Sequence, residues 1–139
     1  MTLPRTVRWL QATVAVLALV PVTTGAAGVF LGPGLLTAGA IPAVDLDSHF
    51  RYLSGIFLAV GLGFWSCVPN LPDRTARFQA LAGMVVLGGL GRLLSLALAG
   101  PPSIGHCVGL VLELIVVPAL ALWQSRLAHA PGPERQDRP

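Results

Sequence analysis

The sequence of 139 residues has little charge and no lysine: 11% of its residues are charged, and all nine basic residues are arginine. A soluble domain carries about a quarter charged residues, so this chain has too few to cover a surface that faces water. Two cysteines are too few for a disulfide scaffold. Hydrophobic residues make up 54% of the chain, which excludes an intrinsically disordered protein. The class that remains is a small integral membrane protein.

Four apolar segments are long enough, or nearly so, to cross a hydrocarbon core of about 30 Å as helices of about 20 residues. None alternates polar and apolar residues as the strands of a membrane β-barrel do. We therefore predict an all-α integral membrane protein, a bundle of four transmembrane helices within residues 1–129, followed by a disordered cytoplasmic tail at residues 130–139. The four helices are expected at about residues 7–30, 50–68, 77–99 and 107–124.

The placement of arginine predicts the orientation of these spans. Arg51 falls on one side of the membrane with Asp45 and Asp47, and seven arginines fall on the other side: Arg5, Arg8, Arg74, Arg77, Arg126, Arg135 and Arg138. By the positive-inside rule, both termini face the cytoplasm. The abundance of Ala, Gly, Pro and Arg is typical of a GC-rich bacterial genome. We expect a multi-pass protein of the bacterial inner (plasma) membrane.

The first apolar segment has an alternative interpretation. Arg5 and Arg8, the apolar run and the small residues at 24–27 also fit a cleavable signal peptide. Cleavage would leave three spans with the new N-terminus outside. The apolar run continues through Phe30 and Leu31, which is longer than a typical signal peptide core and favours an uncleaved span.

Two charges of opposite sign lie inside predicted spans. Arg92 lies seven residues before the outer end of its segment and Glu113 six residues after the outer end of the next, which places both about 9–10 Å deep at 1.5 Å per residue. A short turn with Gly and Pro joins the two segments, so they are expected to be antiparallel neighbours. An unpaired charge at the centre of a bilayer costs about 2.5–3.5 kcal/mol. We therefore predict an Arg92–Glu113 ion pair.

Helical spacing predicts a larger polar cluster around this pair. Small and polar residues share one stripe on each of three segments. We expect five candidate ligand-binding residues to converge in the outer half of the bundle: Arg51, Arg92, Ser95, His106 and Glu113. Asp45, Asp47 and His49 of the outer loop would close over them. The pair is either a structural clamp, or a polar pocket for a ligand headgroup or a proton-transfer site.

The sequence contains no pattern for a metal, a nucleotide or haem. The Asp and His residues near position 47 match no known ligand spacing, and the glycines at 88–91 lie inside an apolar span rather than in a phosphate-binding loop. No catalytic residue is identified. The arginines are spread along the chain, so no clustered basic face for nucleic acid is expected.

Several of these residues also carry a resemblance to a known family. The chain resembles, over about residues 47–123, the bacterial membrane proteins catalogued as domain of unknown function 4345 (DUF4345). The resemblance rests on Asp-Ser-His-Phe-Arg-Tyr at 47–52, Ser-Gly-Ile-Phe at 54–57, Gly-Gly-Leu-Gly-Arg at 88–92 with Ser95, Gly100 and Pro102, Leu-Glu-Leu at 112–114, Pro118, and Trp-Gln at 123–124. It implies a small four-helix membrane protein, similar in layout to DoxX-like proteins, with no established activity.

Three functions are compatible with the sequence. The first is an accessory or interaction protein, which meets the lipid bilayer and a membrane-protein partner or a second copy of itself through faces rich in Gly and Ala. The second is the binding or transport of a small amphipathic ligand, a lipid or a quinone, held by Arg51, Arg92 and Glu113. The third is a membrane enzyme with Glu113 as acid or base. We rank the enzyme last, because the sequence shows no substrate cavity, and the accessory role first.

Overall fold

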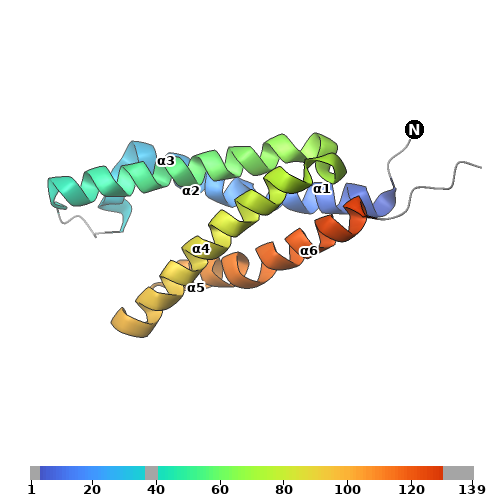
Figure 1. Cartoon of the computed structure of the whole chain (residues 1–139). Coiled ribbons are helices and arrows are strands. Elements are labelled where there is room, and N and C mark those ends of the chain that lie inside the picture. Colours follow the sequence, from blue (N-terminus) through green and yellow to red (C-terminus); the bar gives the residue numbers. More distant parts are fainter. Residues whose placement is uncertain (1–3, 37–40, 130–139) are drawn as a thin grey trace, which may run out of the picture. The chain divides into compact units, whose positions relative to one another are not determined.

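The computed structural model describes residues 4–36 and 41–129, and within them every regular element is a helix (Figure 1). This confirms the all-α prediction. The chain forms two compact units, one of residues 11–69 and one of residues 1–10 with residues 70–139. The predicted tail at residues 130–139 lies outside the described residues.

The described chain begins with two helices that follow each other almost without interruption. Helix α1 covers Arg5–Leu17 and α2 covers Leu19–Leu31. Pro21 explains the interruption at Ala18, because proline has no N–H for the carbonyl four residues earlier and its ring crowds that carbonyl. A 3₁₀ turn, Gly32–Leu35, follows α2.

Helix α3, Val44–Cys67, lies alongside α2 (Figure 1). The two backbones approach closely at glycine. A Cβ atom on Gly25 would lie 2.6 Å from the backbone nitrogen of Leu58, and one on Gly61 would lie 2.7 Å from the Val22 side chain. Small residues at such points allow helices to associate in lipid, where hydrophobic attraction between helices is absent.

Side chains of α1 fasten the end of α3 by hydrogen bonds. The Gln11 side-chain amide donates to the carbonyl of Val68 at 2.7 Å, and the Trp65 indole donates to the carbonyl of Ala15 at 2.9 Å. Both acceptors are backbone groups, one beyond the last residue of α3 and one inside α1. The end of α3 is therefore held by polar contacts as well as by packing.

Beyond α3, the 3₁₀ segment Val68–Arg74 leads into helix α4, Thr75–Ala99. Asn70 interrupts the helical run with φ −128° and ψ 48°. Gly100 follows α4 with φ 91°, a conformation that favours glycine, and its N–H bonds to the carbonyl of Leu96.

The rest of the second unit is one helical run with a wide turn in its middle. Helix α5 covers Ile104–Val111, a π-helical turn covers Leu112–Val116, and α6 covers Val117–Ala128. Helix α4 packs against both the π-helical turn and α6. Figure 1 shows α4 beside α5 and α6.

A buried glutamine network ties α4 to α6. Gln124 is 1% exposed, and its amide donates to the carbonyl of Leu71 at 3.0 Å and to the Thr75 hydroxyl at 2.8 Å. The Gln79 amide donates to the carbonyl of Ala121 at 2.9 Å and to the Ser125 hydroxyl at 2.8 Å. These donors are satisfied by protein acceptors, as buried polar groups require.

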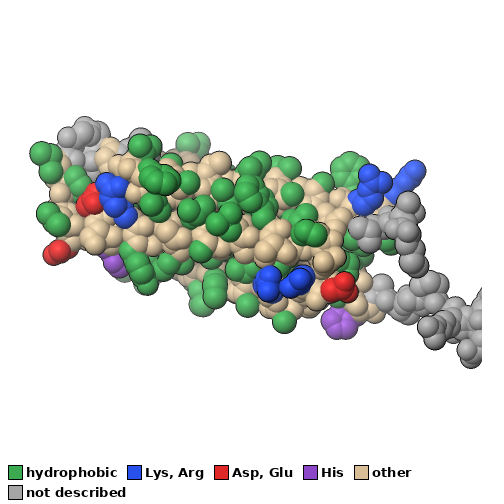
Figure 2. Space-filling view, turned by 90° about the horizontal axis from the view of Figure 1, so that it is seen from above, with side chains coloured by type: hydrophobic (Ala, Val, Ile, Leu, Met, Phe, Trp, Pro, Cys, Tyr) green, Lys and Arg blue, Asp and Glu red, His purple; other side chains and the backbone are tan. Residues whose placement is uncertain are grey.

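Three continuous helical stretches are long and apolar enough to cross a membrane: Arg5–Gly34, Val44–Ala99 and Ile104–Ala128. The number differs from the four spans predicted, because the 3₁₀ segment Val68–Arg74 joins α3 and α4 into one run of 56 residues. Hydrophobic side chains are spread widely over the face shown in Figure 2, and the charged ones gather at a few places. This surface is consistent with a membrane protein.

Helix α3 also begins earlier than predicted. It starts at Val44, not near residue 50, so Asp45, Asp47 and His49 belong to its first turns rather than to an outer loop. The physical reason is that carboxylates are favoured at a helix N-terminus, where the helix dipole is positive. Pro42 just before the helix also fits a boundary there.

The glycine contacts generate the first prediction. Replacing Gly25→Ala should destabilise the protein by about 1–3 kcal/mol, because the new methyl group overpacks the α2–α3 contact. Gly55→Ala is the matched control, because its Cβ would meet only a Val29 methyl group at 3.9 Å. Reversible unfolding in mixed micelles measures both. A Gly25 variant as stable as the Gly55 variant would contradict the packing described.

A candidate polar site at Arg92 and Glu113

Glu113 lies in the π-helical turn, and the local sequence explains that turn. The N–H of Val117 donates to the carbonyl of Leu112, five residues back, instead of to Glu113. The next residue, Pro118, has no N–H to donate. The backbone carbonyl of Glu113 would accept from Val117 in an α-helix and from residue 118 in a π-helix, and neither N–H is available to it. Single π-helical turns of this kind are frequent at functional sites.

Gly89 brings α4 against this turn. A Cβ atom on Gly89 would lie 2.9 Å from the Cβ of Glu113 and 2.7 Å from a methyl group of Leu114. Any other residue at 89 would push the two backbones apart. Arg92 follows Gly89 by three residues, which places it on the same side of α4. The close approach thus sets the distance between Arg92 and Glu113.

Arg92 and Glu113 form the predicted ion pair. Arg92 Nε lies 3.1 Å from Glu113 Oε2, which confirms the contact expected from their equal depth. The Glu113 side chain is 9% exposed and the Arg92 side chain 40% exposed. The contact lacks hydrogen-bond geometry: Glu113 Oε2 is buried and has no hydrogen-bond partner among the described residues. The Glu113 side chain is thus largely buried, whereas the Arg92 side chain is partly exposed.

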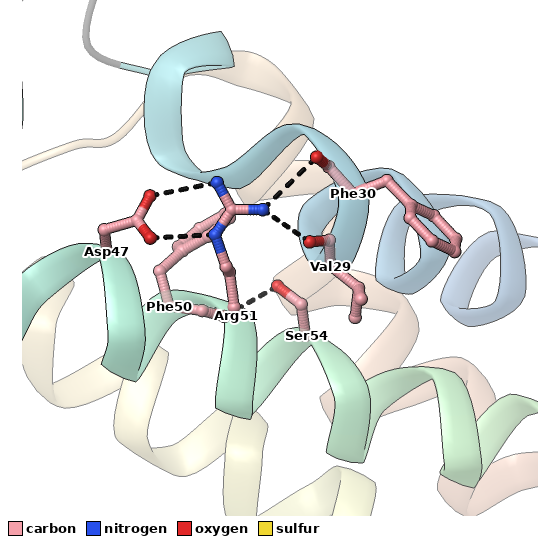
Figure 3. A network of polar contacts seen from close by, with 6 residues as sticks. All are labelled: Val29, Phe30, Asp47, Phe50, Arg51 and Ser54. Carbon is pink, nitrogen blue, oxygen red and sulfur yellow. Dashed lines mark hydrogen bonds and ion pairs between the residues drawn. The ribbon is translucent and has the colours of Figure 1, made fainter.

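Arg51 is engaged very differently, as Figure 3 shows. Its Nε and Nη2 atoms donate to the two carboxylate oxygens of Asp47, at 2.8 Å and 3.2 Å. Its Nη1 atom donates to the carbonyls of Val29 at 2.6 Å and Phe30 at 3.2 Å. These carbonyls belong to the last turn of α2, whose carbonyls have no partner within the helix. Arg51 therefore closes the end of α2 onto α3.

Gly32 makes room for this Arg51 contact. Its φ of 67° favours glycine, and a Cβ there would lie 2.5 Å from Arg51 Nη2 and 2.8 Å from an Asp47 oxygen. The Arg51–Asp47 contact is thus a structural clasp between two helices. Its donors go to protein acceptors, which leaves little for a ligand.

The comparison of the two arginines singles out Arg92. Arg51 makes four hydrogen bonds to its own unit. Arg92 contacts Glu113 through Nε, and its two Nη groups make no hydrogen bond to the described residues, although Arg92 lies within an apolar helix. The Nη groups of Arg92 are therefore free to donate to an acceptor from outside the protein.

The other predicted site residues are only partly gathered. His106 Nδ1 lies 2.9 Å from the Ser103 hydroxyl, a contact at the start of α5, and Ser95 is exposed on α4. Asp45 and His49 are exposed in the first turns of α3. Arg51, Asp45, Asp47 and His49 belong to the first unit, and Arg92, Ser95, His106 and Glu113 to the second. Their convergence into one cluster stays a prediction.

A match to a known family extends over most of the chain. The family described as Domain of unknown function (DUF4345) matches residues 9–124. The chain belongs to this family. No curated protein and no solved structure matches the chain. The residues of the ion pair and of both polar networks, Ser125 excepted, lie inside the matched region of this DUF4345 protein.

The sequence reasoning missed several residues that matter in the DUF4345 chain. Gly89 makes the close approach to Glu113 and Leu114, and the sequence does not distinguish it from the other glycines at 88–91. Gln79 was not singled out, and Gln124 was noted only in the family resemblance. The one available signal was Gln in otherwise apolar helices, since such residues need partners there. Within the described residues, no group of three or more His, Cys, Asp or Glu residues is placed to hold a metal ion.

Proposed function

We propose that this chain is a four-span protein of the bacterial inner membrane that binds the polar head of an amphipathic molecule, a lipid or a quinone, at Arg92 and Glu113. The proposal has two parts. One concerns how the helices cross the membrane, and the other concerns what the Arg92 donors bind.

Helix lengths support four spans. A straight helix of 56 residues would measure about 84 Å, far more than a hydrocarbon core of about 30 Å. Helices α3 and α4, with 24 and 25 residues, are each about 36 Å long and suffice for one crossing. Asn70 breaks the helical run between them, and Pro69 and Pro72 flank it. Four crossings also place the arginine-rich segments on one side.

One observation carries the binding site: the Arg92 side chain is 40% exposed, and it contacts Glu113 through Nε while its two Nη groups make no hydrogen bond to the described residues. A purely structural clamp would use its donors on protein acceptors, as Arg51 does. Glu113 balances the charge of Arg92 through the Nε contact. The remaining N–H groups of the guanidinium are left to donate to a ligand. A head with acceptor oxygens would supply what the protein does not.

A second candidate function is that of an accessory protein that docks against another membrane protein. It is favoured by Gly83, Gly88 and Gly91 of α4, where a Cβ would meet no described atom within 4 Å. Exposed small residues on an apolar helix allow a second helix to approach closely. Recovery of one defined protein with the chain would favour this function.

The topology gives a prediction of its own. Reporters fused at the N-terminus and at the C-terminus should both be active only on the cytoplasmic side, because four spans return the chain to its starting side. A reporter inserted between Gly100 and Ser103 should be active only on the outer side. Termini on opposite sides would contradict four spans and support an odd number of crossings.

Binding can be tested by native mass spectrometry of the protein released from its own membrane. The wild-type protein should retain an amphipathic molecule, and the double variant Arg92→Leu/Glu113→Leu should lose about nine-tenths of it, because a hydrogen bond to a charged group is worth about 1.5–3 kcal/mol. The double variant should still fold, since replacing a buried ion pair by apolar residues is often neutral.

Arg126→Leu is the matched control, because it removes an exposed arginine near the end of α6. It should retain the ligand as the wild type does. Equal retention by the wild type and a folded double variant would refute the binding site. A bare protein in every sample, accompanied by a stoichiometric protein partner, would favour the accessory role.

A further inference from the structure

We infer that the head bound at Arg92 is uncharged and presents oxygen acceptors, such as the carbonyls of a neutral glyceride or of a quinone. This inference rests on the proposed binding function and specifies the chemical class of its ligand. It excludes anionic phosphate or carboxylate heads, which arginine binds well elsewhere.

The charge of the site is the first argument. Arg92 and Glu113 lie 3.1 Å apart with opposite charges, so the pair is neutral as a whole. An anionic head added to it would leave one net negative charge inside an apolar segment, where a charge is costly. An uncharged head leaves the net charge of the site at zero. The repulsion of an anion by Glu113 would be strong, because the interior screens charges weakly.

The accessible atoms are the second argument. Glu113 Oε2 is buried and cannot be reached from the surface, whereas the Arg92 side chain is substantially exposed. A guanidinium carries only donors. An incoming head therefore meets N–H groups and must bring acceptors. A head that offers only donors, such as an ammonium group, cannot pair with the exposed Arg92 side chain.

The surroundings of Arg92 are the third argument. Leu90, Leu93 and Leu94, its neighbours on α4, are large exposed hydrophobic residues. Arg92 lies seven residues before Ala99, the last residue of α4, which is about 10 Å along the helix. The bound molecule must therefore place its head well inside the apolar segment, with its chains against leucine. An uncharged head loses less hydration there than a phosphate does.

Photolabelling in phosphatidylcholine nanodiscs tests the inference. The probes are a diacylglycerol and a phosphatidic acid that carry the same diazirine-bearing acyl chain. Wild-type protein, Arg92→Leu/Glu113→Leu and the control Arg126→Leu are labelled in parallel, and mass spectrometry quantifies the labelled peptides of α4, α5 and α6. A diazirine phosphatidylcholine gives the background from bulk lipid.

We expect the diacylglycerol probe to label the wild type and the Arg126 variant about tenfold more than the double variant, as the loss of a charged hydrogen bond implies. The phosphatidic acid probe should not exceed background. Competition by unlabelled diacylglycerol would assign the site to a neutral glyceride. Competition by a prenylated benzoquinone at a lower concentration than diacylglycerol would assign it to a quinone, and either result supports an uncharged head.

The contrary outcomes separate the two proposals. If phosphatidic acid labels the wild type above background and the double variant does not, the inference of an uncharged head is overturned but the binding site stands. If no probe distinguishes the wild type from the double variant, and neither competitor lowers labelling, both the inference and the proposed function fail.

Discussion

A polar group surrounded by hydrocarbon must find a partner in the protein or in a molecule bound to it. That constraint decides which polar groups of this chain are structural and which are open to a ligand. Its helices satisfy their own backbone, so the exceptions become informative. They are the end of α2, the turn at Val68–Arg74 and the π-helical turn at Leu112–Val116. The structure supplies side-chain partners at the first two places. At the third, a carboxylate oxygen and a backbone carbonyl lack their usual hydrogen bonds.

The partners at the first two places show how completely this chain can satisfy a polar group. Arg51 shares its donors between Asp47 and the last carbonyls of α2. Gln124, almost fully buried, reaches both the carbonyl of Leu71 and the hydroxyl of Thr75. Arg92 differs from Arg51 and Gln124, because its only polar contact among the described residues is with Glu113. This difference separates the structural polar residues from the candidate binding residue.

The sequence could predict the all-helical fold and the Arg92–Glu113 contact, because both follow from simple quantities. Apolar length determines the helical segments, and equal depth on two segments joined by a short turn brings opposite charges together. The role of Arg51 could not be predicted, since its acceptors at Val29 and Phe30 depend on where α2 ends. The sequence also could not show that Gly89, rather than Gly88, makes the close approach to Glu113. Residues three and four positions before Arg92 both lie near its face of the helix.

The helix boundaries illustrate the same limit. The π-helical turn lies just before Pro118, and its geometry depends on which carbonyl the N–H of Val117 selects. Pro69 and Pro72 lie in the segment between α3 and α4, where the chain keeps a helical path through 3₁₀ geometry and breaks only at Asn70. In both places, proline marks where the regular hydrogen bonds fail. It does not determine which irregular geometry replaces them.

The claim that Arg92 donates to an acceptor outside the protein is tested most directly by solid-state NMR. Arginine side chains would be labelled with ¹⁵N, and the host lipids with ¹³C by growth on labelled acetate. Nitrogen–carbon recoupling should reveal a ¹³C carbonyl within about 4 Å of a guanidinium, as a hydrogen bond requires. The account predicts that this signal is present in the wild type and lost in Arg92→Leu/Glu113→Leu. An identical signal in both proteins would contradict it.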